Sequence, residues 1–259
     1  MLLRLALLVF LLFPHSSRAQ AAAPASAPAE QAYSDVSWPS LMRTMVRFNA
    51  FDTKDPALID EYAIITECEL YKAFYQNDFK WKQVQDAVRK SIDINIATFP
   101  TAYHYDAQMQ LDRYDFSSKM FRFAPKSVIN NVNTFDIYSV EGTGCGSADI
   151  KYMPRIFRAV VAVPIYIDGL PLGEKDGNDI LQLMTSDHND SRIITAQFNL
   201  RIVYIEPMRR TVDRSVSDQL LHYTQTNVPQ RNLRLDARLE SIDFFEDPQK
   251  TRLIYRYQP

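Results

Sequence analysis

The chain has 259 residues, with 29 Lys and Arg against 31 Asp and Glu, and a formal net charge of −2. No basic run is longer than Arg209-Arg210, so the charge argues against nucleic acid or anionic lipid as the main partner. The sequence lacks the GxSxG, P-loop and dinucleotide-binding glycine patterns. The usual motifs of α/β-hydrolases and nucleotide-binding enzymes are therefore absent.

The N-terminus has the three parts of a secretory signal peptide. A short basic start ends at Arg4, residues 5–13 are almost wholly apolar, and Ala19-Gln20-Ala21 has the small-x-small pattern of a cleavage site. The apolar run is shorter than the roughly 20 residues that span a bilayer. We therefore predict a signal peptide at 1–21, cleaved after Ala21 or alternatively after Ala19, and a periplasmic or secreted protein.

The mature chain is expected to start with a leader and continue as one domain. Residues 22–32 consist of Ala, Pro, Ser, Gln and Glu, which cannot bury a core and predict a flexible leader. Cleavage would leave 27 basic against 31 acidic residues, a net charge of −4. We expect a single α+β domain at 33–259, with a helical part at 33–99 and a β-rich part at 100–259. No segment of it approaches the length of a transmembrane helix.

Helical spacing dominates the first part of this domain. Trp38-Pro39 opens a short pattern, and Asp55-Pro56 opens a longer one that runs to residue 97, because Asp caps free amides and Pro at the first helical position loses no needed donor. Asn77-Asp78 interrupts the longer pattern and favours a cap. We predict two core-facing helices joined there. Their apolar seam consists of Ile64, Cys68, Tyr71, Tyr75, Trp81, Val84, Val88 and Ile92.

After Pro100 the apolar period changes to two, which is typical of strands with one buried face. The predicted strands are 103–111, 119–123, 132–141, 156–167, 192–206, 231–245 and 250–257, with a short helix at 176–184. Helices segregated from strands indicate an α+β fold, with N-terminal helices packed on a mostly antiparallel sheet of about seven strands. A separate helical subdomain preceding a β-sandwich is the alternative.

The two cysteines are candidates for a disulfide, because the chain is predicted to be exported. Cys68 lies on a predicted helix, and Cys145 lies in the glycine-rich stretch 142–147. A bond between them would tie the helices to the β-rich part, provided that their Cα atoms come within about 4.4–6.8 Å. Alternatively, Cys145 is an exposed thiol that awaits a histidine base.

The densest cluster of possible metal ligands is a polar loop. It contains Asp187, His188 and Asp190, which could hold a divalent cation through carboxylate and imidazole groups. The spacing matches no calcium-binding loop, and a turn solvated by water is the alternative. We expect no cofactor, and we assign no catalytic residue.

Aromatic residues concentrate between 100 and 116 and suggest a ligand groove, because tyrosine offers a flat apolar ring with a polar tip. The candidate residues are Tyr103, Tyr105, Tyr114 and Phe116. The alternative is that they form one face of a strand, where aromatic residues are common.

Four short motifs also stand out. They are Asp60-Glu61-Tyr62, Cys68-Glu69-Leu70-Tyr71, Asn77-Asp78-Phe79-Lys80-Trp81 and Leu111-Asp112-Arg113-Tyr114-Asp115-Phe116. Together they resemble motifs of an uncharacterised family of secreted bacterial proteins. The resemblance implies a periplasmic address, and it implies no activity and no catalytic residues.

The sequence thus predicts an exported protein that acts as a non-enzymatic binding or assembly module for another protein or an envelope component. One alternative is a hydrolase or transferase with an unfamiliar active site near Cys145 or Asp187–Asp190. Another is a small-ligand carrier with a deep apolar pocket between helices and sheet. The oligomeric state stays open.

Overall fold

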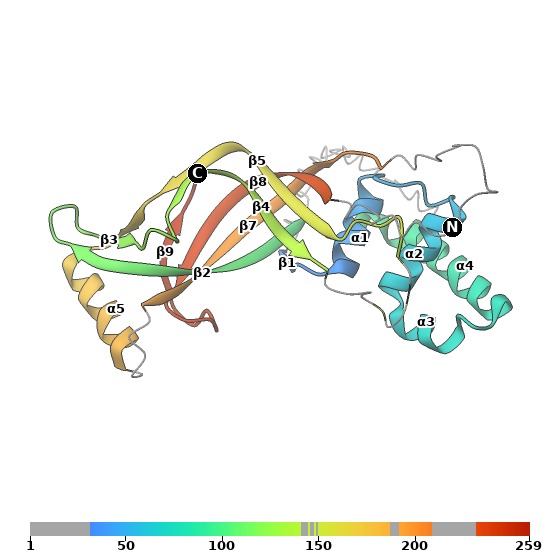
Figure 1. The fold of residues 1–259 in the computed structure, drawn as a ribbon, viewed down its shortest axis with the longest axis horizontal. Helices are drawn as coiled ribbons and strands as arrows, with labels where there is room; N and C mark the ends of the chain where they lie inside the picture. Colours follow the sequence, from blue (N-terminus) through green and yellow to red (C-terminus); the bar gives the residue numbers. More distant parts are fainter. Residues whose placement is uncertain (1–31, 141–144, 146–147, 149, 187–191, 209–231) are drawn as a thin grey trace, which may run out of the picture. The chain divides into compact units, whose positions relative to one another are not determined.

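The computed structural model describes residues 32–140, 145, 148, 150–186, 192–208 and 232–259 (Figure 1). Residues 31–259 belong to one unit. The predicted signal peptide and all but the last residue of the predicted leader lie outside the described residues. The metal candidates Asp187, His188 and Asp190 also lie outside them.

The first helix, α1 (Trp38–Arg47), forms where Trp38-Pro39 predicts it. Its start is fixed by a capping box, because the Ser37 hydroxyl accepts a hydrogen bond from the Ser40 amide and the Ser40 hydroxyl accepts one from the Ser37 amide. Leu41 and Met45 point into the core. The apolar face of α1 thus supplies the packing that keeps so short a helix stable.

The segment predicted as two helices contains three helices and a 3-10 turn. They are α2 (Pro56–Thr66), α3 (Cys68–Phe74), α4 (Asp78–Asn95) and η1 (Ile96–Thr98). The caps expected at Asp55 and Asn77 are confirmed, since Asp55 Oδ1 accepts from the Ala57 amide at 2.9 Å and Asn77 Oδ1 accepts from the Lys80 amide at 3.0 Å. These side chains satisfy amides that lack a partner within the helix.

The additional break lies at Glu67, whose φ of −126° and ψ of 47° are not helical. Ile64, Cys68 and Tyr71 keep helical spacing across it, so periodicity alone does not reveal the break. Burial explains it, because most of α2 is buried whereas α3 contains no buried residue. The turn at Glu67 takes the chain from the core to the surface.

Nine strands of the described chain form one mixed sheet, in the order β4-β5-β8-β7-β2-β3-β6, with β1 beside β2 and β9 beside β8. Their bounds are β1 (Ser34–Asp35), β2 (Ala102–Asp115), β3 (Met120–Phe123), β4 (Ile129–Ser139), β5 (Ile156–Ile167), β6 (Gly169–Pro171), β7 (Ile193–Ile205), β8 (Asn232–Phe245) and β9 (Leu253–Tyr257). The seven predicted strands are all present. The β1–β2 and β5–β8 pairs are parallel and the others are antiparallel, which confirms the α+β class.

The sheet curls into a half-barrel (Figure 1). β5 pairs with β8 as far as Val161, and β6, which follows β5 after Asp168, pairs with β3 on the other side of the sheet. The backbones of β6 and β3 approach closely where these strands pair, since a Cβ atom on Gly169 would lie 2.2 Å from the Phe121 carbonyl oxygen. Glycine is required at this position because any side chain would overlap the backbone of β3. The predicted short helix, α5 (Glu174–Ser186), follows β6.

The interior of the curl is aromatic. The Phe198 ring packs between Tyr105 and Phe135, with ring centroids 5.9 and 5.3 Å apart, and Phe123 lies 5.9 Å from Phe244. These rings come from β2, β3, β4, β7 and β8, so one cluster joins both sides of the curled sheet. Such rings bury large areas and account for much of the core.

The helices meet the sheet at one end of its strands. The Trp38 Nε1 group donates to the Pro154 carbonyl at 3.1 Å, just before β5, and the Thr44 hydroxyl bonds to the Tyr103 hydroxyl at the start of β2. The Met208 amide, just after β7, donates to the Ala50 carbonyl at 2.6 Å. The start of β2 and the end of β7 are neighbours because these strands are antiparallel.

A buried carboxylate strengthens this junction. Glu61 of α2 accepts hydrogen bonds from three consecutive backbone amides, those of Lys151 at 2.6 Å, Tyr152 at 2.9 Å and Met153 at 2.8 Å. Only 4% of Glu61 is exposed. One side chain thereby accepts hydrogen bonds from three amides of the segment that leads into β5.

The predicted disulfide is confirmed. Cys68, the first residue of α3, is bonded to Cys145, and their Cα atoms lie 5.6 Å apart, within the range of ordinary disulfides. The bond spans a sequence separation of 77 residues. It ties the least buried helix of the helical part to the segment before β5.

Candidate functional site

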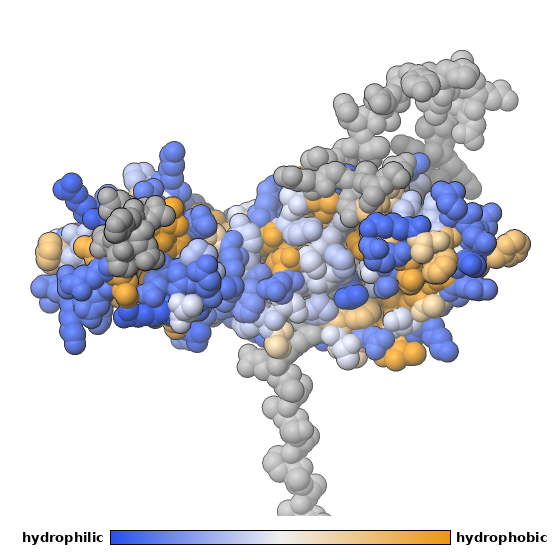
Figure 2. Space-filling model, turned by 90° about the horizontal axis from the view of Figure 1, so that it is seen from below, coloured by the Kyte–Doolittle hydropathy of each residue, from blue (hydrophilic) through white to orange (hydrophobic). Residues whose placement is uncertain are grey.

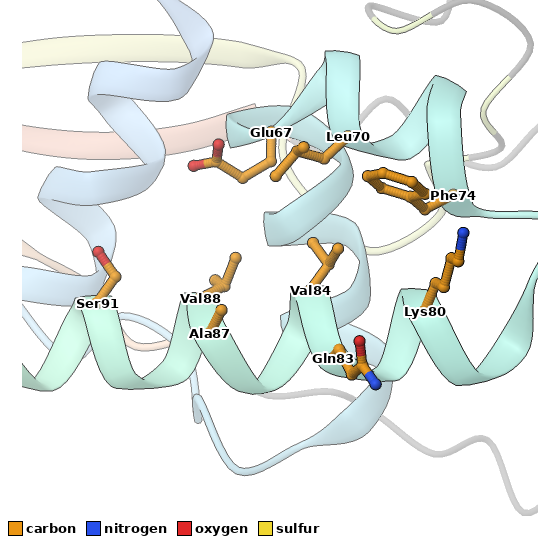
Figure 3. A pocket seen from close by; sticks show the side chains of 9 residues that line it. All are labelled: Glu67, Leu70, Phe74, Lys80, Gln83, Val84, Ala87, Val88 and Ser91. Atoms are coloured by element: carbon orange, nitrogen blue, oxygen red, sulfur yellow. The ribbon is translucent and has the colours of Figure 1, made fainter.

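A groove lies between α3 and α4 in the helical part, with a volume of about 550 Å³ (Figure 3). We call it the α3–α4 groove. Its lining residues are Glu67, Leu70, Phe74, Lys80, Gln83, Val84, Ala87, Val88 and Ser91. Leu70 and Phe74 point from α3 toward Val84 and Val88 on α4 (Figure 3). The middle of the groove is thus apolar.

The groove is open to solvent along its length. Leu70 is 40% exposed, and Ala87 and Ser91 on α4 are also exposed. The short side chains of Ala87 and Ser91 leave space beside Val88, which α3 does not fill. Two helices that packed fully would bury such residues against each other. The hydrophobic surface left between them is the kind that marks an interaction site.

The back of the groove is held in place by polar and aromatic contacts. Asp60 Oδ1 on α2 accepts hydrogen bonds from Trp81 Nε1 and Gln85 Nε2, both at 2.6 Å. The Tyr71 and Tyr75 rings meet the Trp81 ring edge to face, at centroid distances of 5.7 and 5.5 Å. These contacts fix α4 to α2 and α3. The groove is therefore preformed, which lowers the ordering cost of binding.

The two ends of the groove carry opposite charges. Glu67 and Ser91 lie at one end, and Lys80 lies beside Phe74 at the other (Figure 3). The Lys80 ammonium lies 5.4 Å from the centroid of the Phe74 ring, a cation–π distance. A ligand that fills the groove would contact the Glu67 carboxylate at one end, apolar side chains in the middle and the Lys80 ammonium at the other end.

Hydrophobic side chains are also exposed around the groove. Figure 2 shows hydrophobic atoms among hydrophilic ones at the surface of the end that carries the helices. The large exposed hydrophobic residues of this part are Leu70, Tyr75, Phe79 and Ile94. Of these, Leu70 lines the groove. Tyr75, Phe79 and Ile94 are exposed outside the lining of the groove.

The four aromatic residues proposed for a ligand groove lie along β2 and are not brought together. Tyr103 is fully buried, and its hydroxyl bonds to Thr44 and to the Ser40 carbonyl. Burial raises the pKa of Tyr103 to about 12, against the lowering effect of these hydrogen bonds. Tyr105 packs in the interior of the sheet.

The other two residues of that set lie at the far end of β2. The Tyr114 ring packs edge to face on Phe116 and Phe121, and Phe116 is 72% exposed. At about 3.3 Å per residue, Tyr103 and Tyr114 are roughly 35 Å apart along the strand. The structure thus places the set at two ends of one strand.

The sheet carries a row of polar groups that sequence reasoning missed. His104 on β2, Asn199 on β7 and Ser241 on β8 are cross-strand neighbours. His104 Nδ1 lies 2.7 Å from Asn199 Oδ1, and Asn199 Nδ2 donates to Ser241 Oγ at 2.7 Å and to Asp243 Oδ2 at 3.1 Å. Asn199 is only 4% exposed. Buried polar groups in such a row are stabilising because they satisfy one another.

A second row lies beside the first and reaches β9. Gln197 Nε2 donates to Asp106 Oδ1 at 3.0 Å, and Arg256 forms two hydrogen bonds with Asp243 at 2.6 and 2.8 Å. Lys250 pairs with Asp106 at 2.8 Å. Each of these groups has a partner within the sheet, so the two rows fix the register of β2, β7, β8 and β9.

Glu240, a neighbour of these rows, is held ionised by cations. Arg201 donates two hydrogen bonds to its carboxylate at 2.7 and 3.0 Å, Arg238 donates one at 2.6 Å, and the Tyr33 hydroxyl donates another. Partial burial acts to raise the pKa of Glu240, but the hydrogen bonds and charges outweigh it and lower the pKa to about 2. Ionised Glu240 therefore stabilises the fold.

This lowered pKa predicts an acid-sensitive contribution to stability. The folded pKa lies below the unfolded value of 4.5, so the contribution is present above pH 4.5 and is lost as the pH falls toward 2. Because the cluster is partly solvated, we expect Glu240→Gln to cost about 2 kcal/mol at pH 7 and much less at pH 2.5. Urea unfolding at both pH values measures this.

The matched control for this prediction is Glu206→Gln. Glu206 is an exposed glutamate just after β7, and its replacement is expected to change stability by less than about 0.5 kcal/mol at either pH. Equal losses for Glu240→Gln at pH 7 and pH 2.5 would show that Glu240 does not act through its charge.

The structure also bears on the proposed Cys145 nucleophile, on metal binding and on membrane-spanning helices. Cys145 is oxidised in the disulfide and so carries no thiolate for catalysis. Within the described ranges, no group of three His, Cys, Asp or Glu side chains is placed to hold a metal ion. The helices that the structure describes include none with both the length and the hydrophobicity to cross a bilayer.

Residues 55–152 match the family model of a domain of unknown function, DUF4852. This stretch contains all four motifs on which the resemblance to an uncharacterised family rests, both cysteines and the whole α3–α4 groove. The match agrees with that resemblance and assigns no activity. No curated protein and no solved structure matches the chain.

Proposed function

We propose that the protein is an exported, non-enzymatic binding module that takes an apolar segment of another protein into the α3–α4 groove. The observation that carries this proposal is the open, preformed, apolar groove between α3 and α4. A helix laid in a hydrophobic groove is a recurring mode of protein recognition. The partner's apolar side chains would cover the apolar surface of α4 that α3 leaves exposed.

The dimensions of the groove fit a short helix. Its lining on α4 runs from Lys80 to Ser91, which at 1.5 Å per residue is about 16 Å, or three helical turns. A small ligand would be enclosed to a greater extent, since small-molecule sites bury most of the ligand surface. The exposure of Leu70, Ala87 and Ser91 therefore favours a protein segment over a small molecule.

Export is supported by two features. The sequence has the parts of a signal peptide at 1–21. The Cys68–Cys145 disulfide is compatible with an extracytoplasmic location, because such bonds persist in oxidising compartments. A periplasmic address is thus part of the proposal, and the partner is expected in the same compartment.

Binding of a model peptide tests the proposal. A synthetic amphipathic peptide of about 14 residues, with leucines at helical spacing and uncharged polar residues elsewhere, is expected to bind the protein in fluorescence anisotropy. Ala87→Gln fills the groove without altering a buried residue, and Leu70→Ser removes part of its apolar wall. Each should weaken binding by about tenfold or more, equivalent to about 1.4 kcal/mol.

The matched control is Val163→Ser. Val163 is also an exposed apolar residue, at 72%, but it belongs to β5 and does not line the groove, so the variant should bind as the unaltered protein does. The proposal fails if the peptide does not bind, or if all three variants affect binding equally.

A further inference from the structure

We infer that the α3–α4 groove selects an amphipathic helix with an acidic first turn and a basic last turn, and holds it parallel to α4. The inference rests on the proposed function, since it concerns the partner of the same groove. In this arrangement the acidic end of the partner lies at Lys80 and the basic end lies at Glu67.

The charges at the ends of the groove carry the inference. Lys80 and Glu67 lie at opposite ends (Figure 3), and no ion pair joins either of them to another side chain in the described part of the chain. The Lys80 ammonium lies over the Phe74 ring, which is uncharged. Both charges are thus available to a ligand, and complementary charges fix the register and direction of binding.

The dipole of the bound helix determines in which direction it runs along α4. Acidic residues favour the first turn of a helix and basic residues favour the last, because the helix dipole is positive at the N-terminus and negative at the C-terminus. In a stable short helix, the acidic residues are therefore expected in the first turn, at the N-terminus. Since Lys80 is near the start of α4 and Ser91 is near its end, such a helix runs parallel to α4.

Spacing supports the same partner. The α4 residues that line the groove span about three turns, so an acidic and a basic residue about ten to eleven positions apart would reach both ends. Leucines at steps of three and four between them would face Leu70, Val84 and Val88. The selected ligand is therefore a helix with an apolar stripe and a charge of opposite sign at each end.

The experiment uses one charged peptide and the purified protein with its disulfide intact. The peptide carries two glutamates in its first turn, two lysines in its last turn and leucines between them. Its affinity is measured for the unaltered protein and for Lys80→Glu, Glu67→Lys and the double variant Lys80→Glu/Glu67→Lys. At low salt each single substitution should weaken binding by about fivefold.

The double variant reverses both ends, so the peptide can turn round and recover its affinity. A nitroxide on the peptide N-terminus shows the direction, because it broadens NMR signals of nearby residues. We expect broadening around Lys80 in the unaltered protein and around Ser91 in the double variant. Lys80→Gln and Glu67→Gln change the size of the side chain little and leave one charged end each, so each should reduce the preference for one direction, and high salt should remove that preference.

The outcomes separate this inference from the proposed function. If neither the charged peptide nor its uncharged counterpart binds, the proposed function fails. If both bind, but the charge variants leave affinity unchanged or the nitroxide broadens both ends equally, the groove binds helices without selecting their direction, and only the present inference is overturned.

Discussion

Replacing both cysteines, as Cys68→Ala/Cys145→Ala, should lower the free energy of unfolding by about 4 kcal/mol. The disulfide closes a loop with a sequence separation of 77 residues. A cross-link of this span lowers the conformational entropy of the unfolded chain, and at room temperature this loss is equivalent to about 4 kcal/mol of stability. Urea unfolding followed by tryptophan fluorescence measures the change, with the slope of the transition compared between the two proteins.

The same change should also affect the groove. Cys68 is the first residue of α3, and no residue of α3 is buried, so the disulfide is a covalent link that holds α3 to the β-rich part. The variant, studied at low temperature where it remains folded, should bind the model peptide more weakly. A loss of less than about 1 kcal/mol in stability, together with unchanged peptide binding, would contradict this role for the disulfide.

The second large effect is expected at Glu61. Glu61→Ala would remove the acceptor for the amides of Lys151, Tyr152 and Met153, of which the Met153 amide is fully buried. Each unsatisfied buried group costs about 1–3 kcal/mol. Because burial raises the pKa of Glu61 more than these amides lower it, burying the carboxylate itself has a cost. We therefore expect a net loss of about 3 kcal/mol in unfolding free energy.

The control for Glu61 is a second glutamate of the helical part. The Glu69 side chain is 85% exposed and pairs only with Lys72 on the surface, so Glu69→Ala should cost less than about 0.5 kcal/mol. Glu61→Gln keeps one acceptor oxygen and should fall between the two. If Glu61→Ala unfolds at the same urea concentration as Glu69→Ala, the carboxylate does not anchor the segment before β5.

Local signals in the sequence were sufficient for most of the fold. Asp55 and Asn77 mark the starts of α2 and α4 because their side chains cap amides within the same few residues. Likewise, the alternation in β8 reflects one face buried in the sheet, whereas β7 is buried along most of its length. The disulfide was predictable because the chain has only two cysteines and features of an exported protein.

Features that depend on distant contacts were not predictable. The break at Glu67 follows from the different burial of α2 and α3, which helical spacing does not contain. β1 and β6 comprise two and three residues, too few for a period of two to be visible. The pairing of Asn199 with Ser241 depends on the register of two strands far apart in the sequence.

The candidate site was also missed for a physical reason. The apolar seam of the helix pair predicts a core-facing surface and not a binding site, since such seams are usually buried. Leu70 and Phe74 lie beside that seam, and only the packing of α3 against α4 shows that they line an open groove. The predicted binding role remains a proposal, which we place in this groove.

Hydrogen exchange tests the central claim most directly. The amides of the protein are compared with and without the model peptide at a saturating concentration. We expect added protection in α3 and α4, on both walls of the groove, and little change in the amides of β7 and β8. Protection confined to the β-sheet, or no change in α3 and α4 when the peptide is bound, would contradict the assignment of the groove as the binding site.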